Sequence, residues 1–102
     1  MIHVIASIRA RSGQRDALAE AFRKILDRVR AKPGCLEYGL AVHAPSGLAG
    51  QAPYSEHELT IVEKWEDLAA LHAHLADAVY LEWFREQTSL IDSASMQVLD
   101  AL

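Results

Sequence analysis

Residues 2–11 read IHVIASIRAR, and apolar side chains occupy every second position of this stretch. A period of two residues predicts a β-strand. One face of the strand would carry Ile2, Val4, Ala6, Ile8 and Ala10, and the other would carry Ile5 among polar side chains. A sheet with helices on one side normally shows water a polar face. Because both faces of this strand are partly apolar, we expect a second copy of the chain to cover the side without helices.

The spacing of apolar residues changes at Gln14. From there they recur three or four positions apart as far as Val29, which predicts an amphipathic α-helix. We expect Ser12 to cap the start of this helix, and the Lys-Pro-Gly stretch 32–34 to end it.

Beyond residue 34 the sequence predicts three more strands and two short helices. Stretches 35–43 and 58–65 alternate like the first strand, and 96–99 would form the last one. The intervening 44–57 has no period and forms a long connection, of a kind that lines a site or embraces a partner. Asp67 and Asp77 are expected to cap the helices, the second of which would reach Ile91. The order β-α-β-β-α-β predicts an α+β, ferredoxin-like fold in a single domain, 1–102.

Charge, cysteine content and hydropathy exclude several classes of protein. A formal net charge of −4 argues against a nucleic-acid-binding protein, which needs a basic surface. Cys35 is the only cysteine, so no disulfide can form within the chain. No apolar stretch approaches the roughly 18 residues of a membrane helix, and positive charges follow the first apolar run rather than precede it. We therefore expect a cytoplasmic protein without membrane contact.

No strong catalytic or metal-binding motif is present. The sequence has no glycine-rich phosphate loop, no paired CxxC and no nucleophile elbow. His72 and His74 are two positions apart on a predicted helix, so their side chains diverge by about 200° and cannot share a metal ion. The other three histidines lie on separate elements. We expect no metal site.

His74 is the first candidate for chemistry, because it follows Leu71 by three positions at the edge of the stripe that should face the sheet. A neutral imidazole there could act as a base. The alternative is a half-buried structural histidine that bonds a backbone carbonyl, and the sequence leaves both open.

Glu63 is the second candidate, since it shares a strand face with Trp65. A carboxylate on a half-buried face needs a partner or a shifted pKa. Glu63 could orient His74 or a ligand hydroxyl, but the favoured interpretation is an ion pair with an arginine such as Arg9.

Aromatic side chains could line an apolar pocket for a flat ring, although aromatics at helical spacing are more often part of the core. The candidates are Trp65, Tyr80, Trp83 and Phe84, with Tyr38 open to either interpretation. Cys35 is interpreted as a small buried side chain rather than a nucleophile.

Three stretches together resemble the antibiotic biosynthesis monooxygenase superfamily, and specifically its small quinol-monooxygenase-like branch. They are MIHVIASIRARSGQ (1–14), KPGCLEY (32–38) and TIVEKWEDLAALHAHL (60–75). The resemblance implies a dimeric α+β barrel, in which two ferredoxin-like domains pack sheet to sheet. It also implies oxidation of a hydroquinone-like or polyketide phenol with dioxygen, without metal or flavin cofactors.

The resemblance also implies site residues. His74 matches the histidine of the family's HL pair and would be the catalytic base, and Trp65 matches its strand-three tryptophan. The Ser7 face of the first strand would then line the pocket, leaving Val4, Ala6 and Ile8 to pack against the partner. The expected substrate pocket comprises Ser7, Tyr38, Glu63, Trp65, Leu71, Tyr80 and Phe84.

Two departures from the family limit what it implies. Relatives usually carry a second histidine after a proline beyond the HL pair, where this chain has Asp77, Ala78 and Val79. The heme-degrading branch uses an asparagine and a histidine near the positions of Ser7 and Phe84, and this chain contains no asparagine. Heme degradation is therefore not expected. A non-redox enzyme such as an isomerase, and a non-catalytic dimer that binds a small aromatic, remain alternatives on the same scaffold.

Overall fold

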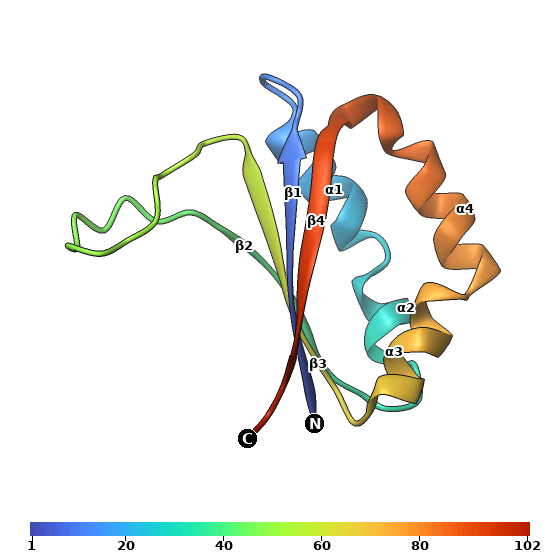
Figure 1. Cartoon of the computed structure of the whole chain (residues 1–102). Coiled ribbons are helices and arrows are strands. Elements are labelled where there is room, and N and C mark those ends of the chain that lie inside the picture. Colours follow the sequence, from blue (N-terminus) through green and yellow to red (C-terminus); the bar gives the residue numbers. More distant parts are fainter.

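A computed structural model describes all residues, 1–102. Four antiparallel strands form one sheet in the order β2-β3-β1-β4, and every helix lies on the same side of it (Figure 1). This arrangement confirms the predicted α+β, ferredoxin-like fold. The elements are β1 (Ile2–Ala10), α1 (Arg15–Arg23), α2 (Leu26–Arg30), β2 (Cys35–Val42), β3 (Glu58–Trp65), α3 (Leu68–Leu75), α4 (Ala78–Glu86), a 3₁₀ turn (Thr88–Leu90) and β4 (Ile91–Asp100).

The first predicted helix is divided into two. α1 ends at Arg23, and the backbone N–H of Ile25 donates to the carbonyl of Phe22, three residues back, before α2 begins. The predicted cap at Ser12 is wrong, since the helix starts at Arg15 with Gln14 as a cap that makes no side-chain bond. None of the helices is both long and apolar enough to cross a membrane.

The two aspartate caps are confirmed. Asp67 accepts a hydrogen bond from the backbone of Ala70, and Asp77 accepts one from the backbone of Val79. The end of α4 was placed too late by the sequence pattern, because Ile91 is the first residue of β4 and pairs with Ala10. The last strand is therefore longer than the predicted 96–99 and extends along the whole of β1.

The core lies between the helices and the Val4 face of β1. Val4 is fully buried and Ile8 nearly so, and both belong to the same hydrophobic core as Phe22 of α1. This corrects the expectation that Val4, Ala6 and Ile8 pack against a partner. This face carries the large side chains that fill the space under the helices. Ser7 alternates with them along β1, so it lies on the face that no helix covers.

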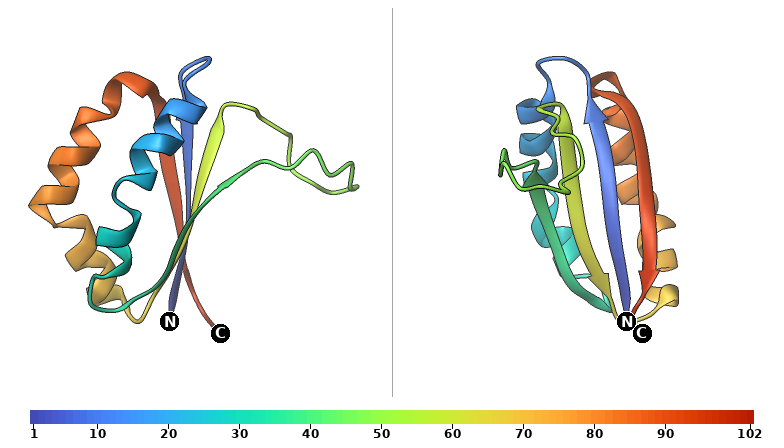
Figure 2. Two further views of the ribbon diagram at one scale, coloured as in Figure 1. Left: turned by 180° about the vertical axis from the view of Figure 1, so that it is seen from behind. Right: turned by 60° about the vertical axis from the view of Figure 1, so that its left-hand side comes forward.

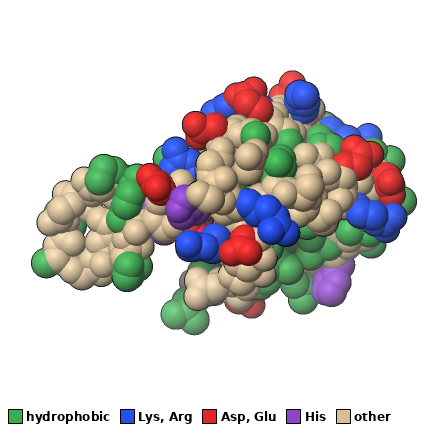
Figure 3. Space-filling view, turned by 90° about the horizontal axis from the view of Figure 1, so that it is seen from above, with side chains coloured by type: hydrophobic (Ala, Val, Ile, Leu, Met, Phe, Trp, Pro, Cys, Tyr) green, Lys and Arg blue, Asp and Glu red, His purple; other side chains and the backbone are tan.

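The uncovered face of the sheet is flanked by the connection between β2 and β3. Residues 43–57 extend away from the sheet on the side opposite the helices (Figures 1 and 2). Seen from above, this segment stands off from the body of the molecule and carries apolar side chains (Figure 3). Among them, Leu48 is 72% exposed and Tyr54 is 50% exposed.

Candidate active site

An apolar cavity of about 290 Å³ lies between the sheet and helices α3 and α4. Nine of its twelve lining residues are hydrophobic, and the other three are Glu63, His74 and Ser95. The residues that line this inner cavity are Ala6, Ile8, Ile61, Glu63, His74, Leu75, Tyr80, Leu81, Phe84, Ala94, Ser95 and Met96. A space of this size and lining suits a small, largely apolar ligand that carries few polar groups.

Glu63 brings a carboxyl group into the inner cavity from the middle of β3. Its side chain is buried, and its Oε1 accepts a hydrogen bond of 2.9 Å from the indole Nε1 of Trp65. Burial raises the pKa of Glu63 above its usual value, and the Trp65 bond opposes this only in part. The favoured ion pair with Arg9 is not formed. Arg9 is on the opposite face of the sheet from Glu63 and pairs with Asp92 at 3.7 Å.

The imidazole of His74, on α3, is packed among three aromatic rings. It stacks on the indole of Trp65 with 4.9 Å between ring centroids, and lies 4.3 Å from the ring of Tyr80 and 5.8 Å from that of Tyr38. Only 2% of the residue is exposed. The side chain makes no bond to a backbone carbonyl, so the structural alternative does not describe its contacts.

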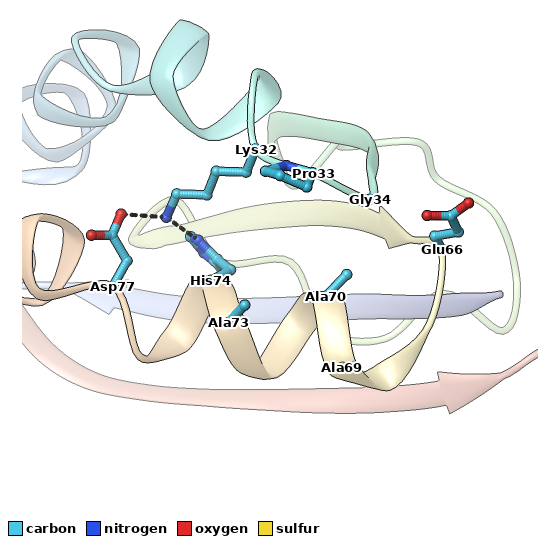
Figure 4. A pocket seen from close by; sticks show the side chains of 9 residues that line it. All are labelled: Lys32, Pro33, Gly34, Glu66, Ala69, Ala70, Ala73, His74 and Asp77. Atoms are coloured by element: carbon cyan, nitrogen blue, oxygen red, sulfur yellow. Dashed lines mark hydrogen bonds and ion pairs between the residues drawn. The ribbon is translucent and has the colours of Figure 1, made fainter.

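The partner of the imidazole is a lysine that the sequence did not suggest. Lys32 follows α2, and its Nζ lies 2.8 Å from Nδ1 of His74 and 2.8 Å from Oδ2 of Asp77 (Figure 4). No sequence pattern links these three positions, since 42 residues separate Lys32 from His74. In the sequence, Lys32 appears only as part of the signal that ends the first helix.

These contacts set the charges of the site. Burial, and then the positive charge of Lys32, lower the pKa of His74 to about 4, although Asp77 acts in the opposite direction. The hydrogen bond from Lys32 is the largest cause of a pKa of about 2 for Asp77. At neutral pH the site therefore combines a neutral imidazole with a lysine–aspartate ion pair.

The family model for antibiotic biosynthesis monooxygenase matches residues 1–86. The chain belongs to this family. The matched range contains β1 to β3 and α1 to α4. It therefore includes Glu63, His74 and Lys32 together with the residues that contact them.

The chain is also similar to one curated protein and to solved structures. Probable quinol monooxygenase YgiN of Escherichia coli strain K12 is 38% identical over 77 residues, which cover 74% of this chain and 73% of that protein. The crystal structure of PA3566 from Pseudomonas aeruginosa has a TM-score of 0.80 at 28% identity, covering 99% of this chain and 93% of that one. Rv0793 from Mycobacterium tuberculosis also has a TM-score of 0.80, at 25% identity, covering 99% and 94%.

The structure brings half of the residues expected at the catalytic site and substrate pocket to the inner cavity. Glu63, His74, Tyr80 and Phe84 line it. The remaining residues do not line the cavity: Trp65, Tyr38 and Leu71 are buried behind it, and Ser7 lies on the open face of the sheet.

Tyr38 is the most notable of the residues behind the cavity. Its hydroxyl is buried without a hydrogen-bond partner, and burial raises its pKa above the usual value. A protonated phenol next to His74 adds no negative charge to the candidate site.

The structure contains no cluster of side chains that could bind a metal ion. No three histidine, cysteine, aspartate or glutamate side chains are placed so that they could hold a metal ion. Burial raises the pKa of the Cys35 thiol, which disfavours the thiolate form that a metal or a nucleophilic mechanism needs.

Proposed function

We propose that this protein is a monooxygenase that uses dioxygen to oxidise a small hydroquinone-like phenol in the inner cavity. The family and the similarity to a probable quinol monooxygenase support this class of reaction. The observation that carries the proposal is the lining of the cavity, where a carboxyl with a raised pKa and a neutral imidazole are set among apolar side chains. Such a site can take a proton from a phenol and hold the resulting anion away from water.

Glu63 is the better base of the two. The imidazole of His74 already accepts a hydrogen bond at Nδ1 from Lys32, and its pKa of about 4 makes it a weak base. The pKa of Glu63 is shifted in the favourable direction, toward the working pH, because the carboxylate is buried. His74 keeps a catalytic role as a hydrogen-bond donor to the substrate oxygen, which differs from the base suggested by the family resemblance.

The reaction needs no electron source other than its substrate. Glu63 accepts the proton of one phenol hydroxyl, whose pKa is about 10 if it behaves like tyrosine. The anion gives one electron to dioxygen, and the phenoxyl radical and superoxide combine at a ring carbon into a peroxide anion. This anion takes the proton back from Glu63 and becomes a ring hydroperoxide. Loss of water from the hydroperoxide leaves a hydroxyquinone, so that one oxygen atom enters the product and the other becomes water. The mechanism therefore proceeds without a metal ion or flavin.

A second copy of the chain is proposed to cover the open face of the sheet. That face carries the apolar side chains of Ile5, Val62 and Leu99, and the 43–57 segment extends past it. Leu48 and Tyr54 on this segment are exposed, which suits contacts with a partner subunit. The resulting homodimer would have a sheet-to-sheet interface and would leave the inner cavity of each subunit under its own helices.

Oxygen consumption with a panel of hydroquinones tests the proposal. Substrate-dependent uptake above the rate of spontaneous oxidation, with little hydrogen peroxide released, is the expected result. Conversion of a ligand without oxygen uptake would favour an isomerase on this scaffold. Binding of the panel without any turnover would favour a non-catalytic dimer, and both outcomes would overturn the proposal.

A further inference from the structure

His74 lies between two hollows. One is the inner cavity, and the other is an outer groove between the 32–34 connection and α3 (Figure 4). Its Nδ1 is turned toward Lys32, which lines the groove and not the cavity. The contact with Lys32 is the only hydrogen bond of the imidazole ring, and His74 also lines the inner cavity. Nε2 is therefore the ring nitrogen left to meet a ligand there.

The contact with Lys32 determines where the imidazole carries its proton. An ammonium group has three donors and no acceptor, so Lys32 must donate and Nδ1 of His74 must accept. A neutral imidazole has one N–H, and with Nδ1 unprotonated that N–H is at Nε2.

The ammonium group is held in place from several sides. Oδ2 of Asp77 lies 2.8 Å from Nζ, and the ring of Tyr80 lies beneath it, 5.1 Å to its centroid. The Lys32 side chain is only 15% exposed, and that of Asp77 19%. Arg28 also contacts Oδ2 of Asp77, at 3.3 Å, but does not reach the imidazole.

The backbone that carries Lys32 is fixed against α3. Gly34 has φ +79, and a Cβ at this position would lie 2.6 Å from Cβ of Ala70. The carbonyl of Gly34 also accepts a hydrogen bond of 2.8 Å from the backbone of Glu66, just before α3. The connection therefore approaches the helix as closely as a glycine permits, and this brings Lys32 within reach of His74.

We infer that Lys32, anchored by Asp77, is a positioning residue that fixes His74 as the Nε2–H tautomer and makes it a hydrogen-bond donor to an anionic oxygen in the inner cavity. The anionic oxygen is the phenolate of the proposed function, on which this part of the inference rests. The positive charge of Lys32 also favours the phenolate, acting through the polarisable ring of His74 rather than by direct contact.

The tautomer can be measured without any substrate. Two-bond ¹H–¹⁵N correlation spectra of the uniformly labelled protein distinguish a protonated ring nitrogen from an unprotonated one. At neutral pH we expect His74 to show an unprotonated Nδ1 and a protonated Nε2. A protonated Nδ1 in the wild type would overturn the inference, and this measurement needs no variant that has to fold.

Variants then test whether Lys32 is the cause. Lys32→Met keeps the length of the apolar stem and should give a mixture of both tautomers, whereas Arg28→Met removes a charge at Asp77 alone and should leave Nε2–H. Binding of 4-nitrophenol, followed by the absorbance of its phenolate, gives a second readout. Its apparent pKa on the protein should rise by about one pH unit in Lys32→Met and not in Arg28→Met.

The outcomes separate this inference from the proposed function. An unchanged tautomer and an unchanged 4-nitrophenol pKa in a folded Lys32→Met protein would refute the role of Lys32. The expected tautomer in a protein that consumes no oxygen with any hydroquinone would leave the positioning role intact and refute the monooxygenase instead.

Discussion

The indole of Trp65 stacks on the imidazole of His74 at 4.9 Å, with 21° between the ring planes, and its N–H donates to Glu63. One buried side chain therefore orients both polar groups of the inner cavity that are proposed to act on the substrate. Trp65 does not line the cavity itself. Its importance is in fixing the distance and direction of Glu63 relative to His74.

Replacing this ring should weaken both the fold and the site. Trp65→Ala removes a fully buried side chain, and we expect the free energy of unfolding to fall by about 3–5 kcal/mol in chemical denaturation. Trp65→Phe keeps an aromatic ring next to His74 but removes the donor to Glu63, so it should raise the pKa of Glu63 further with a smaller loss of stability. If Trp65→Ala were as stable as the wild type, the tight packing around His74 would be disproved.

Glu63→Gln should lower turnover by about 10²–10⁴-fold, the usual contribution of general base catalysis. The pKa of Glu63 lies above its ordinary value of 4.5, so the wild-type rate should rise with pH as this group loses its proton, at a pH above 4.5. The rising limb should disappear in Glu63→Gln. Glu37→Gln, at an exposed position that pairs with Lys64, is the matched control and should leave both the rate and the limb unchanged.

His74 should make stability depend on pH. Its pKa is about 4 in the folded protein against 6.5 in the unfolded chain, so the unfolded chain binds the proton more tightly between these values. Stability is then fully present above pH 6.5, and up to about 3 kcal/mol is lost as the pH falls toward 4. His74→Gln should flatten this part of the stability profile, whereas His72→Gln, exposed on the same helix, should not. A profile that remains steep in His74→Gln would assign the effect to another group.

Gly34→Ala should destabilise the protein more than a second glycine with the same backbone conformation. Gly34 and Gly47 both have positive φ, +79 and +69, but only at Gly34 would a new Cβ meet another atom within 4 Å. We expect Gly47→Ala to cost about 1 kcal/mol from backbone strain, and Gly34→Ala clearly more, together with reduced activity because Lys32 moves. Thermal melts compare the two. Equal losses of stability in the two variants would show that the close approach of Gly34 to α3 does not constrain this position.

The chain should be a homodimer in solution, with at least about 1,200 Å² buried at the interface. Light scattering at micromolar concentration measures this directly. Val62→Glu, placed on the open face of the sheet, should shift the molecule toward the monomer, while Glu82→Gln on exposed α4 should not. A monodisperse wild-type monomer would contradict the proposed interface.

The order of strands and helices along the chain and two of the three predicted caps were predictable because they depend on local sequence. Alternation in 2–11 and 58–65 identifies strands, and Asp67 and Asp77 act as caps through contacts with residues two or three positions away. Alternation does not say which face of a strand receives the helices. Both faces of β1 carry apolar groups. The family resemblance therefore placed Ser7 under the helices and Val4 on the open face, whereas the structure shows the reverse.

The site was only partly predictable, because its polar contacts join distant parts of the chain. Glu63 and His74 could be identified by their position among apolar neighbours. Their partners could not, because Trp65 was interpreted as a wall of the pocket and Lys32 as part of a helix stop. The close approach of Gly34 to Ala70 that brings Lys32 to His74 depends on tertiary packing, for which the sequence carries no periodic signal.

The fate of labelled oxygen decides whether this protein is a monooxygenase. A hydroquinone that the enzyme turns over is supplied with ¹⁸O₂, and the product and water are examined by mass spectrometry. We expect one ¹⁸O atom in the hydroxyquinone and one in water, with labelled product formed about 10²–10⁴-fold more slowly in Glu63→Gln. A quinone product that carries no ¹⁸O would contradict the monooxygenase mechanism.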